Sequence, residues 1–536
     1  MRSLAVLLRD VKDVTIKEEQ LKHLLALIKP DLEEHDRQNT LFTLLRAIIN
    51  RKLIVPEIYE MMERVAEIMV TNQSEKVRET CRNIQLQFLL DYPQGKNRLR
   101  KQMTFLAQNL SYVHESGRLS VMEFLSALFI RFSPEILREH GDVLFLSLIM
   151  VLANDDSAKC KEISTTLIKL LISTYDKVNR DKVVSIVHSW SQQNNQSSLL
   201  RLSAQVIGIF VDGIESESKM YLSTLLDDLL NLVQFDNEWQ VIYHALNSIS
   251  KVISIFPQSI NDIKWLNVKN RLMYPHVWVR FQASKLINTL FGSQPNGPFL
   301  PKLIKGKTIK DDQYLLSLEG LIDLSRFFCN ELKSEHIDND IAHQIVKNLI
   351  FISRCFALVD VQLKKGIEDE NDETIVEKVI EDEDKEDDEE NDDDDDENNL
   401  SSYRDPLGWL FRKLSYQCRL SFFKRTFEDN MNEKKMWIMQ PTFILHWMGY
   451  MVNVLESDRL KSVIYQLLHP IIRIQSDANV KQDKELEELQ GLAQQVQVMI
   501  QDKVDNMTFT KVYQAIRSRA NAVKEQRKTA RKQNVR

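Results

Sequence analysis

A basic or polar residue recurs about every 40 residues through the first half of the chain, and this period constrains the fold more than any other feature. The recurring residues stand near the predicted starts of helices, at spacings of 41, 40, 41, 42, 39 and 40. They are Arg37, Arg78, Arg118, Lys159, Arg201, Gln240 and Arg280. Such a period is typical of helix-pair repeats of the HEAT and armadillo classes. Because one pair cannot bury its apolar face alone, neighbouring pairs stack.

Large apolar residues follow the same period. Eleven positions after five of the seven marks stand Ile48, Leu89, Phe129, Leu170 and Phe291. In the Arg201 and Gln240 repeats this position is polar, and the nearest apolar residues are one step away, at Val211 and Val252. We expect these residues to lie in the core between helix pairs.

The composition excludes the main alternative to helices. The 536 residues include 13 Gly and 12 Pro, together about 5%, whereas average usage is roughly 12%. This is too few turn-forming residues for a β-sandwich, barrel or propeller. The sequence therefore predicts an all-α, HEAT/armadillo-like α-solenoid superhelix with a disordered acidic insert and a long basic C-terminal helix.

The insert and the tail divide the chain into four predicted parts. HEAT-like helical repeats occupy 1–366, a disordered acidic insert 367–399, further C-terminal helical repeats 400–480, and a long helix ending in a basic tail 481–536. The insert contains five consecutive aspartates, Asp392 to Asp396, and no aromatic residue. Such a segment cannot bury enough apolar surface to become ordered.

The net charge of −7 is an average over these unlike parts. Residues 368–397 carry a net charge of −19, residues 503–536 carry +8, and the rest of the chain carries +4. A mildly basic body with a basic tail indicates a polyanionic partner, most often a nucleic acid.

The C-terminal segment gives the strongest functional signal. Val504, Phe509, Val512 and Ile516 form one apolar stripe at helical spacing. Beyond the stripe, basic residues surround the helix and are candidate RNA-binding residues: Arg517, Arg519, Lys524, Arg527, Lys528, Arg531 and Lys532. A helix that is polar on all sides has no face to pack on its own solenoid, and this density of cations suits phosphate contacts. The alternative is a solvated tail or a nuclear-import signal.

Two further basic clusters are better explained as solvated surface. Lys96, Arg98, Arg100 and Lys101 fall in a predicted turn between repeats, and Lys302, Lys305, Lys307 and Lys310 fall in a predicted loop. Five tryptophans occur at helical spacings, and we predict core positions for them rather than base-stacking positions: Trp239, Trp278, Trp409, Trp437 and Trp447.

No catalytic, cofactor-binding or metal-binding residues are predicted, and no small-molecule substrate. Gly306, Lys307 and Thr308 resemble the end of a phosphate-binding loop, but the first glycine of that motif would fall on Pro301. The five cysteines are far apart, so we predict packed, reduced thiols of a cytosolic or nuclear protein. The longest apolar stretch, 143–153, is too short for a membrane span, and residues 1–9 are too short for a secretory signal. We expect no membrane association.

Specific strings add a resemblance to a known family. The strings are NRKLIVPEI (50–58), LDYPQG (90–95), HESGR (114–118), NDDSAKCK (154–161), YPHVWVR (274–280) and DPLGWLFRKLS (405–415). In this order they resemble the C-terminal region of the DRIM family, very large HEAT-repeat, U3 small nucleolar RNA-associated components of the small-subunit processome.

The resemblance implies a non-enzymatic scaffold in the nucleus and nucleolus. It would support pre-18S ribosomal RNA processing and small ribosomal subunit assembly, with pre-ribosomal RNA, the U3 snoRNP and processome proteins as partners. A transport or signalling adaptor that binds protein cargo is the competing class. Because the resemblance covers only the C-terminal part of much longer chains, we expect an exposed apolar edge at the N-terminal end of the solenoid.

Overall fold

The computed structural model describes residues 2–11, 16–32, 34–302, 314–334, 337–364, 405–424, 431–476 and 484–534. In these ranges every regular element is a helix and there is no strand, which confirms the predicted all-α HEAT/armadillo-like solenoid. The acidic insert at 367–399 lies outside the described residues, and so do Lys305, Lys307 and Lys310. The domain boundaries predicted near 366, 399 and 480 also fall outside them and stay predictions.

The chain forms two compact units, Met1–Phe256 and Pro257–Arg536. We call them unit 1 and unit 2. The division falls inside the region predicted as one run of repeats. Both units are built from helix pairs arranged in two layers.

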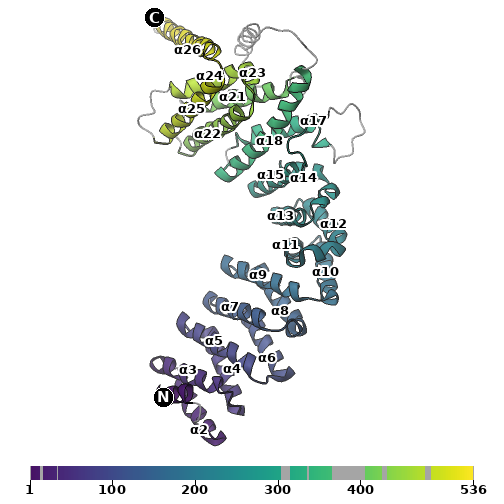
Figure 1. Ribbon diagram of the computed structural model, residues 1–536, viewed down its shortest axis with the longest axis vertical. Helices are drawn as coiled ribbons and strands as arrows, with labels where there is room; N and C mark the ends of the chain where they lie inside the picture. Colours follow the sequence, from purple (N-terminus) through teal and green to yellow (C-terminus); the bar gives the residue numbers. More distant parts are fainter. Residues whose placement is uncertain are drawn as a thin grey trace. The chain divides into compact units, whose positions relative to one another are not determined.

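Unit 1 contains thirteen described α-helices and two short 3₁₀ helices. The α-helices are α1 (Arg2–Asp10), α2 (Glu18–Ile28), α3 (His35–Asn50), α4 (Pro56–Thr71), α5 (Glu75–Asp91), α6 (Gly95–Asn109), α7 (Glu115–Arg131), α8 (Pro134–Asn154), α9 (Ala158–Thr174), α10 (Lys177–Ser191), α11 (Ser197–Ile214), α12 (Leu222–Val233) and α13 (Trp239–Ile255); the 3₁₀ helices are η1 (Pro30–Leu32) and η2 (Glu215–Tyr221). Helices α3, α5, α7, α9, α11 and α13 contact one another in sequence and form one layer (Figure 1). Their partners α4, α6, α8, α10 and α12 form the other layer.

The core of unit 1 follows the predicted period with one exception. Ile48, Leu89 and Phe129 are buried, but Leu170 is 38% exposed, and Leu171 is completely buried in its place. The shift arises because Lys159 is the second residue of α9, whereas the marks in α5 and α7 are the fourth residues of their helices. Counting eleven residues from the mark therefore falls two residues short of the equivalent position, which is Ile172 and is also completely buried.

Unit 2 repeats the two-layer arrangement. Its helices are η3 (Pro257–Asp262), α14 (Trp265–Arg271), α15 (Val277–Gly292), α17 (Leu318–Glu331), α18 (Asn339–Lys364), α21 (Pro406–Lys424), α22 (Met431–Val454), α23 (Ser457–Ser462), α24 (Ile464–Gln475), α25 (Lys484–Lys503) and α26 (Asn506–Asn534). Helices α15, α18, α22 and α25 contact one another in sequence in one layer, and α17, α21, α24 and α26 do so in the other.

The prediction of one long helix over 481–536 is wrong, because α25 and α26 are separate helices. The Asp505 carboxylate accepts a hydrogen bond from the Thr508 backbone N–H at 2.9 Å and so caps the start of α26. At the end of α25, the Lys503 ammonium donates to the carbonyl oxygens of Val452 and Asn453, at 2.8 and 2.6 Å. Both contacts fix the break between the helices.

The expected apolar edge is present at the start of unit 1. In α1, Ala5 and Leu8 are buried, whereas Val6 is 48% exposed and Leu7 is 39% exposed. Apolar side chains therefore occupy both faces of this short helix, and the described residues cover only one face.

Candidate interaction surfaces

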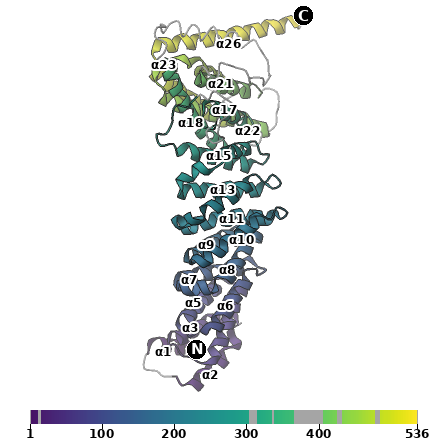
Figure 2. The same ribbon diagram turned by 90° about the vertical axis from the view of Figure 1, so that its right-hand side faces the viewer.

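The basic helix α26 is anchored by its first half. Phe509, Val512 and Ile516 are buried, and the helix packs on α24. Its C-terminal half extends past the other helices of unit 2 (Figure 2). Both features confirm the predicted long basic helix that packs through one apolar stripe.

The candidate RNA-binding residues all follow the apolar stripe of α26, from the middle of the helix to its C-terminal end. Arg517 is exposed, and its guanidinium lies over the Tyr513 ring at 5.2 Å. Arg519 is partly buried. The backbone of the helix includes the other five candidates, whose side chains lie outside the described residues: Lys524, Arg527, Lys528, Arg531 and Lys532. Their role in RNA binding stays a prediction.

The second basic cluster was predicted to lie in a turn between repeats, and this prediction is wrong. The cluster occupies the first seven residues of helix α6. Gly95, with φ +59°, makes the sharp entry that lets the helix begin directly after Gln94. The Arg98 guanidinium lies 3.9 Å from the centre of the Tyr59 ring, and the Lys101 ammonium lies 2.7 Å from the Glu63 carboxylate on α4. Two of these cations therefore already contact side chains of α4. Of the third cluster, only Lys302 is described, and it is exposed.

Three of the arginines that mark the 40-residue period form a repeated internal contact. Arg78 donates from Nη1 to the carbonyl oxygens of Asn72 and Gln73, at 2.8 and 2.9 Å, in the loop between α4 and α5. Arg118 makes the same contact with Tyr112 and Val113, at 2.9 and 3.0 Å. These backbone acceptors lie six and five residues before the arginine in each case. We call this contact the arginine staple.

Unit 2 contains the staple as well. Arg280 donates to the carbonyl oxygens of Tyr274 and Pro275, at 3.0 and 2.8 Å, and its Nε lies 2.6 Å from a Glu331 carboxylate oxygen. The staple satisfies carbonyl groups in the loop that precedes each helix. Each of these three arginines therefore holds its own repeat together and is not available to a partner.

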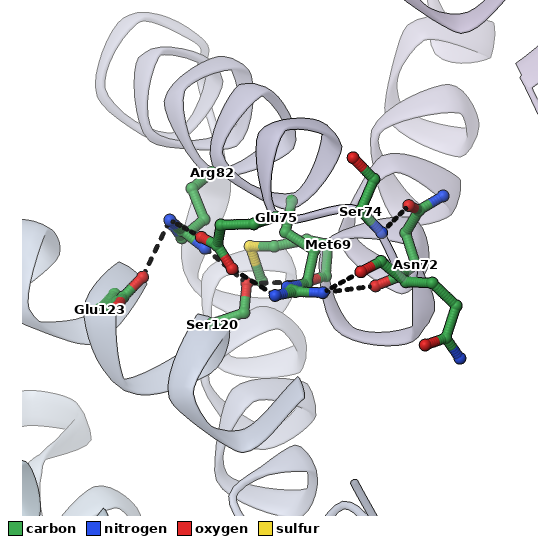
Figure 3. Close-up of polar contacts among 9 residues, drawn as sticks. Met69, Asn72, Ser74, Glu75, Arg82, Ser120 and Glu123 are labelled. Atoms are coloured by element: carbon green, nitrogen blue, oxygen red, sulfur yellow. Dashed lines mark hydrogen bonds and ion pairs between the residues drawn. The ribbon is translucent and has the colours of Figure 1, made fainter. Parts of the chain in front are cut away.

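A polar network around the first staple joins three helices (Figure 3). The Arg82 guanidinium bridges Glu75 on α5 and Glu123 on α7, at 3.0 and 2.8 Å. Arg82 also donates to the Ser120 hydroxyl at 3.0 Å, and that hydroxyl donates to the Met69 carbonyl oxygen at 2.8 Å. The network fixes the relative position of α4, α5 and α7, and we assign it a structural role.

The second staple is reinforced by a buried ion pair. Arg118 Nε and Nη2 donate to the two carboxylate oxygens of Asp155 at 2.7 and 2.9 Å, and the two side chains are only 15% and 4% exposed. Burial alone would raise the pKa of Asp155, but hydrogen bonds from Arg118 and from the Ser157 backbone N–H hold it below its usual value. The hydrogen bonds from Asp155 likewise raise the pKa of Arg118. Both groups therefore stay charged.

The tryptophans divide between core and surface. Trp409 and Trp447 are buried, as predicted. Trp278 is 45% exposed on α15, so the prediction of a core position is wrong for it. Trp239 is partly buried, and the side chain of Trp437 lies outside the described residues.

The described residues contain no constellation to which we would assign catalysis. Nearest to one is His188, whose Nδ1 lies 2.9 Å from a carboxylate oxygen of buried Asp228. The nearby Ser191 hydroxyl donates to the His188 carbonyl oxygen at 2.7 Å instead of to the imidazole, so the pair joins α10 to α12. No group of three or more His, Cys, Asp or Glu residues is placed to hold a metal ion in this part of the chain.

All five cysteines are free and buried, as predicted: Cys81, Cys160, Cys329, Cys355 and Cys418. Burial raises the pKa of Cys81, Cys329 and Cys418 to about 12. These thiols are therefore packed as small apolar groups and do not form thiolates near neutral pH.

Two helical stretches are long and apolar enough to cross a membrane, judged by length and composition alone. They are Ser197–Val233 and Asn339–Val359, and 61% of the apolar window in each is buried inside the protein. The first is interrupted by η2, and both contribute to the packed layers described above. The absence of membrane association stays a prediction.

Comparison with known proteins gives relatives along almost the whole chain. It is 28% identical to the U3 small nucleolar RNA-associated protein 20 of Schizosaccharomyces pombe and 25% identical to that of Saccharomyces cerevisiae, each over 97% of the chain. Both matches cover 19% of the relative, so the chain spans about a fifth of the length of these proteins. Among solved structures, importin beta aligns with 96% of this chain and 66% of its own, at 10% identity and a TM-score of 0.39.

A family model gives the assignment. The model described as "Small subunit processome component 20 homolog, C-terminal" matches residues 200–535. This range is well over half of the chain and runs from α11 to the end of α26. The chain therefore belongs to the family of small subunit processome component 20 homologues, of which it contains the C-terminal region.

Proposed function

We propose that this chain is a non-enzymatic scaffold of the small-subunit processome, which supports pre-18S ribosomal RNA processing and small ribosomal subunit assembly in the nucleus and nucleolus. The observation that carries the proposal is the similarity of 97% of the chain to two proteins named for their association with the U3 small nucleolar RNA. In this proposal the partners are pre-ribosomal RNA, the U3 snoRNP and processome proteins.

The helical layers supply the protein-binding surface of the scaffold. The arginine staples hold the loops before α5, α7 and α15 in fixed conformations, so the repeats that contain them present their exposed residues in a constant position. A rigid surface loses less conformational entropy when a partner binds. No residue is assigned a catalytic role.

In the same proposal, α26 is the charge-driven anchor to RNA. Its helix is held by Phe509, Val512 and Ile516, and the segment 517–534 carries seven cations and one carboxylate, Glu525. Contacts between such cations and phosphates supply affinity without reading the base sequence.

The first experiment tests association in cells. Ultraviolet crosslinking of the tagged protein, followed by sequencing of the bound RNA, should recover pre-ribosomal RNA and U3 RNA, and the protein should sediment with large pre-ribosomal particles. Recovery of neither RNA, with sedimentation among soluble cargo complexes, would overturn the processome role and support the adaptor class.

The second experiment tests the anchor in the full chain. Glutamine replaces the seven candidates Arg517, Arg519, Lys524, Arg527, Lys528, Arg531 and Lys532, and binding to single-stranded RNA is measured against salt. Each lost phosphate contact lowers the slope of log affinity against log salt by about 0.7. If all seven residues contact phosphates, the slope should fall by about 5. A chain truncated after Ile516 should show the same decrease.

The control replaces exposed cations of unit 1, Lys76, Arg131 and Lys159, by glutamine. It should leave the slope unchanged. An unchanged slope in the seven-residue variant, together with its exclusion from the nucleus, would show that the tail is an import signal and that the anchor lies elsewhere.

A further inference from the structure

Helices α15 and α18 of unit 2 lie side by side and expose side chains on one shared face. Asn288 on α15 donates to the side-chain oxygen of Asn348 on α18 at 2.9 Å, and Asn348 donates to the Ser284 carbonyl oxygen at 3.1 Å. Ring stacking of Phe291 on Phe351, with centroids 4.6 Å apart, continues the contact. These residues fix the two helices in register.

The exposed side of this helix pair carries three aromatic rings and three cations, which we call the α15–α18 face. Its residues are Trp278, Phe281 and Lys285 on α15 and Lys347, Phe351 and Arg354 on α18. In each helix they are three or four residues apart and therefore share one side. On both helices this side is adjacent to the residues that join α15 to α18, so the six side chains form one surface.

The aromatic part of the face is open to solvent. Trp278 is 45% exposed and meets the Phe281 ring edge to face, with centroids 6.2 Å apart. The Lys285 ammonium lies 5.4 Å from the centre of the Phe281 ring. A large exposed indole beside a second ring and a cation is a platform on which a planar base can stack.

The cations of the face have no anionic partner among the described residues. Lys285, Lys347 and Arg354 form no ion pair with any residue in the described part of the chain, in contrast to Arg280 in the same helix, which pairs with Glu331. Helix α15 contains no aspartate or glutamate. In α18 the carboxylates are Asp340 in the first turn, two turns before Lys347, and Asp360 near the end. Within the part of the chain that the structure describes, the positive charge of the face is therefore uncompensated.

We propose that the α15–α18 face is a second RNA-binding site, specific for single strands. Bases stack on Trp278 and Phe281, while phosphates contact Lys285, Lys347 and Arg354. Single strands fit because their unpaired bases expose a flat surface that a duplex hides. This site goes beyond the proposed anchor, since it lies on the packed helices of unit 2 and does not involve α26.

Stacking is tested first, in the full chain, with a fluorescent 12-nucleotide oligouridylate. Trp278→Ala should weaken binding about 5- to 150-fold, the range for loss of one base stack, whereas Trp278→Phe should retain most of the affinity. Because Trp278 is half exposed, both variants should unfold at the wild-type temperature. Wild-type affinity in Trp278→Ala would overturn the proposal.

The phosphate contacts are tested by a triple variant, Lys285→Ala, Lys347→Ala and Arg354→Ala. It should lower the salt slope of oligouridylate binding by about 2, because each contact to a single strand contributes about 0.7. The matched control, Lys76→Ala, Arg131→Ala and Lys159→Ala, removes three exposed cations from unit 1 and should leave the slope unchanged. Equal slopes in the two triple variants would contradict the site.

Two further measurements separate this site from the anchor and from a protein-docking surface. A photoreactive 4-thiouridine oligomer should crosslink to peptides of α15 both in the wild type and in the tail-glutamine variant. If these crosslinks disappear in the tail-glutamine variant, RNA binding at the face depends on α26, and the proposal of a separate site is wrong. If an acidic glutamate-rich peptide binds and Trp278→Ala weakens the peptide but not the oligouridylate, the face is a protein-docking surface and the RNA assignment is wrong.

Discussion

Arginine and lysine have opposite surroundings in two regions of the molecule. Within unit 1, Arg78, Arg82 and Arg118 are largely buried and donate to loop carbonyl oxygens or carboxylates of neighbouring helices. On the α15–α18 face of unit 2, the three cations are exposed and have no carboxylate partner in the described part of the chain. The same residue types therefore hold repeats together in one region and remain available to a partner in the other.

This difference shows that basic charge alone does not identify an RNA-binding surface. The cluster in α6 has four cations, one more than the α15–α18 face, but Lys101 is paired with Glu63 and Arg98 is stacked on Tyr59. What distinguishes a candidate surface is the absence of internal partners together with exposed aromatic rings. Variants of both kinds of cation test this distinction.

The largest effect is expected when a staple with a buried ion pair is removed. Arg118→Ala should lower the free energy of unfolding by about 3–5 kcal/mol, because it leaves the Asp155 carboxylate buried without its partner. Amide hydrogen exchange in α7 and α9 would measure the loss, and RNA affinity of the folded fraction should not change. Exposed Arg131→Ala is the control and should stay within about 0.5 kcal/mol. A loss below about 1 kcal/mol would contradict the structural role of the staple.

A pair of leucine variants tests whether Leu170 or Leu171 is the core position in α9. Leu171 is completely buried and Leu170 is 38% exposed. Leu171→Ala should cost about 2–5 kcal/mol through the cavity it leaves, and Leu170→Ala less than about 1 kcal/mol. Denaturant unfolding of the two variants provides the measurement. The reverse order would show that the count from the basic marks, and not the observed burial, gives the core position.

Protonation of His244 in unit 1 should produce a pH-dependent loss of stability. Burial between α11 and α13, with the positive charges of Arg201 and Lys251, lowers the pKa of His244 from 6.5 to about 4. Between these two values the unfolded chain binds a proton that the folded chain does not. Stability is therefore complete above pH 6.5 and falls as the pH drops towards 4, by about 1–3 kcal/mol in total.

The measurement is the difference in unfolding free energy between wild type and His244→Gln across this pH range, which removes the contribution of other titrating groups. In the variant this part of the pH dependence should vanish. If the two curves run parallel from pH 7 to 4, the imidazole is not held neutral by its surroundings.

The smallest effect is expected at an exposed ion pair. The Lys101 and Glu63 side chains are 69% and 49% exposed, so Lys101→Ala should cost at most about 1 kcal/mol and leave the salt slope of RNA binding unchanged. Thermal unfolding and RNA titration of the same variant check both expectations. A reduced slope would show that a paired surface cation also contacts RNA, and the distinction drawn above would fail.

Much of the fold was predictable because its signals are local or periodic. The 40-residue spacing, the shortage of Gly and Pro and the apolar stripe of α26 each depend on neighbours along the chain, and the helix pairs and the basic C-terminal helix follow from them. The break between α25 and α26 was missed because the apolar pattern continues across it. The cap at Asp505 and the contacts of Lys503 with the end of α22 interrupt the helix there.

The basic marks themselves were visible in the sequence, but their role was not. Arg118 and Asp155 are 37 residues apart, and only the stacking of one repeat on the next brings them together. The exposure of Trp278 has the same cause, since its helical spacing is that of a core residue and the neighbouring helices leave it uncovered. The sequence alone was sufficient to predict an array of helix pairs with a basic tail. Only the tertiary structure shows which cations form internal ion pairs and hydrogen bonds and which are exposed. The reason is that ion pairs and burial depend on residues brought together from different repeats.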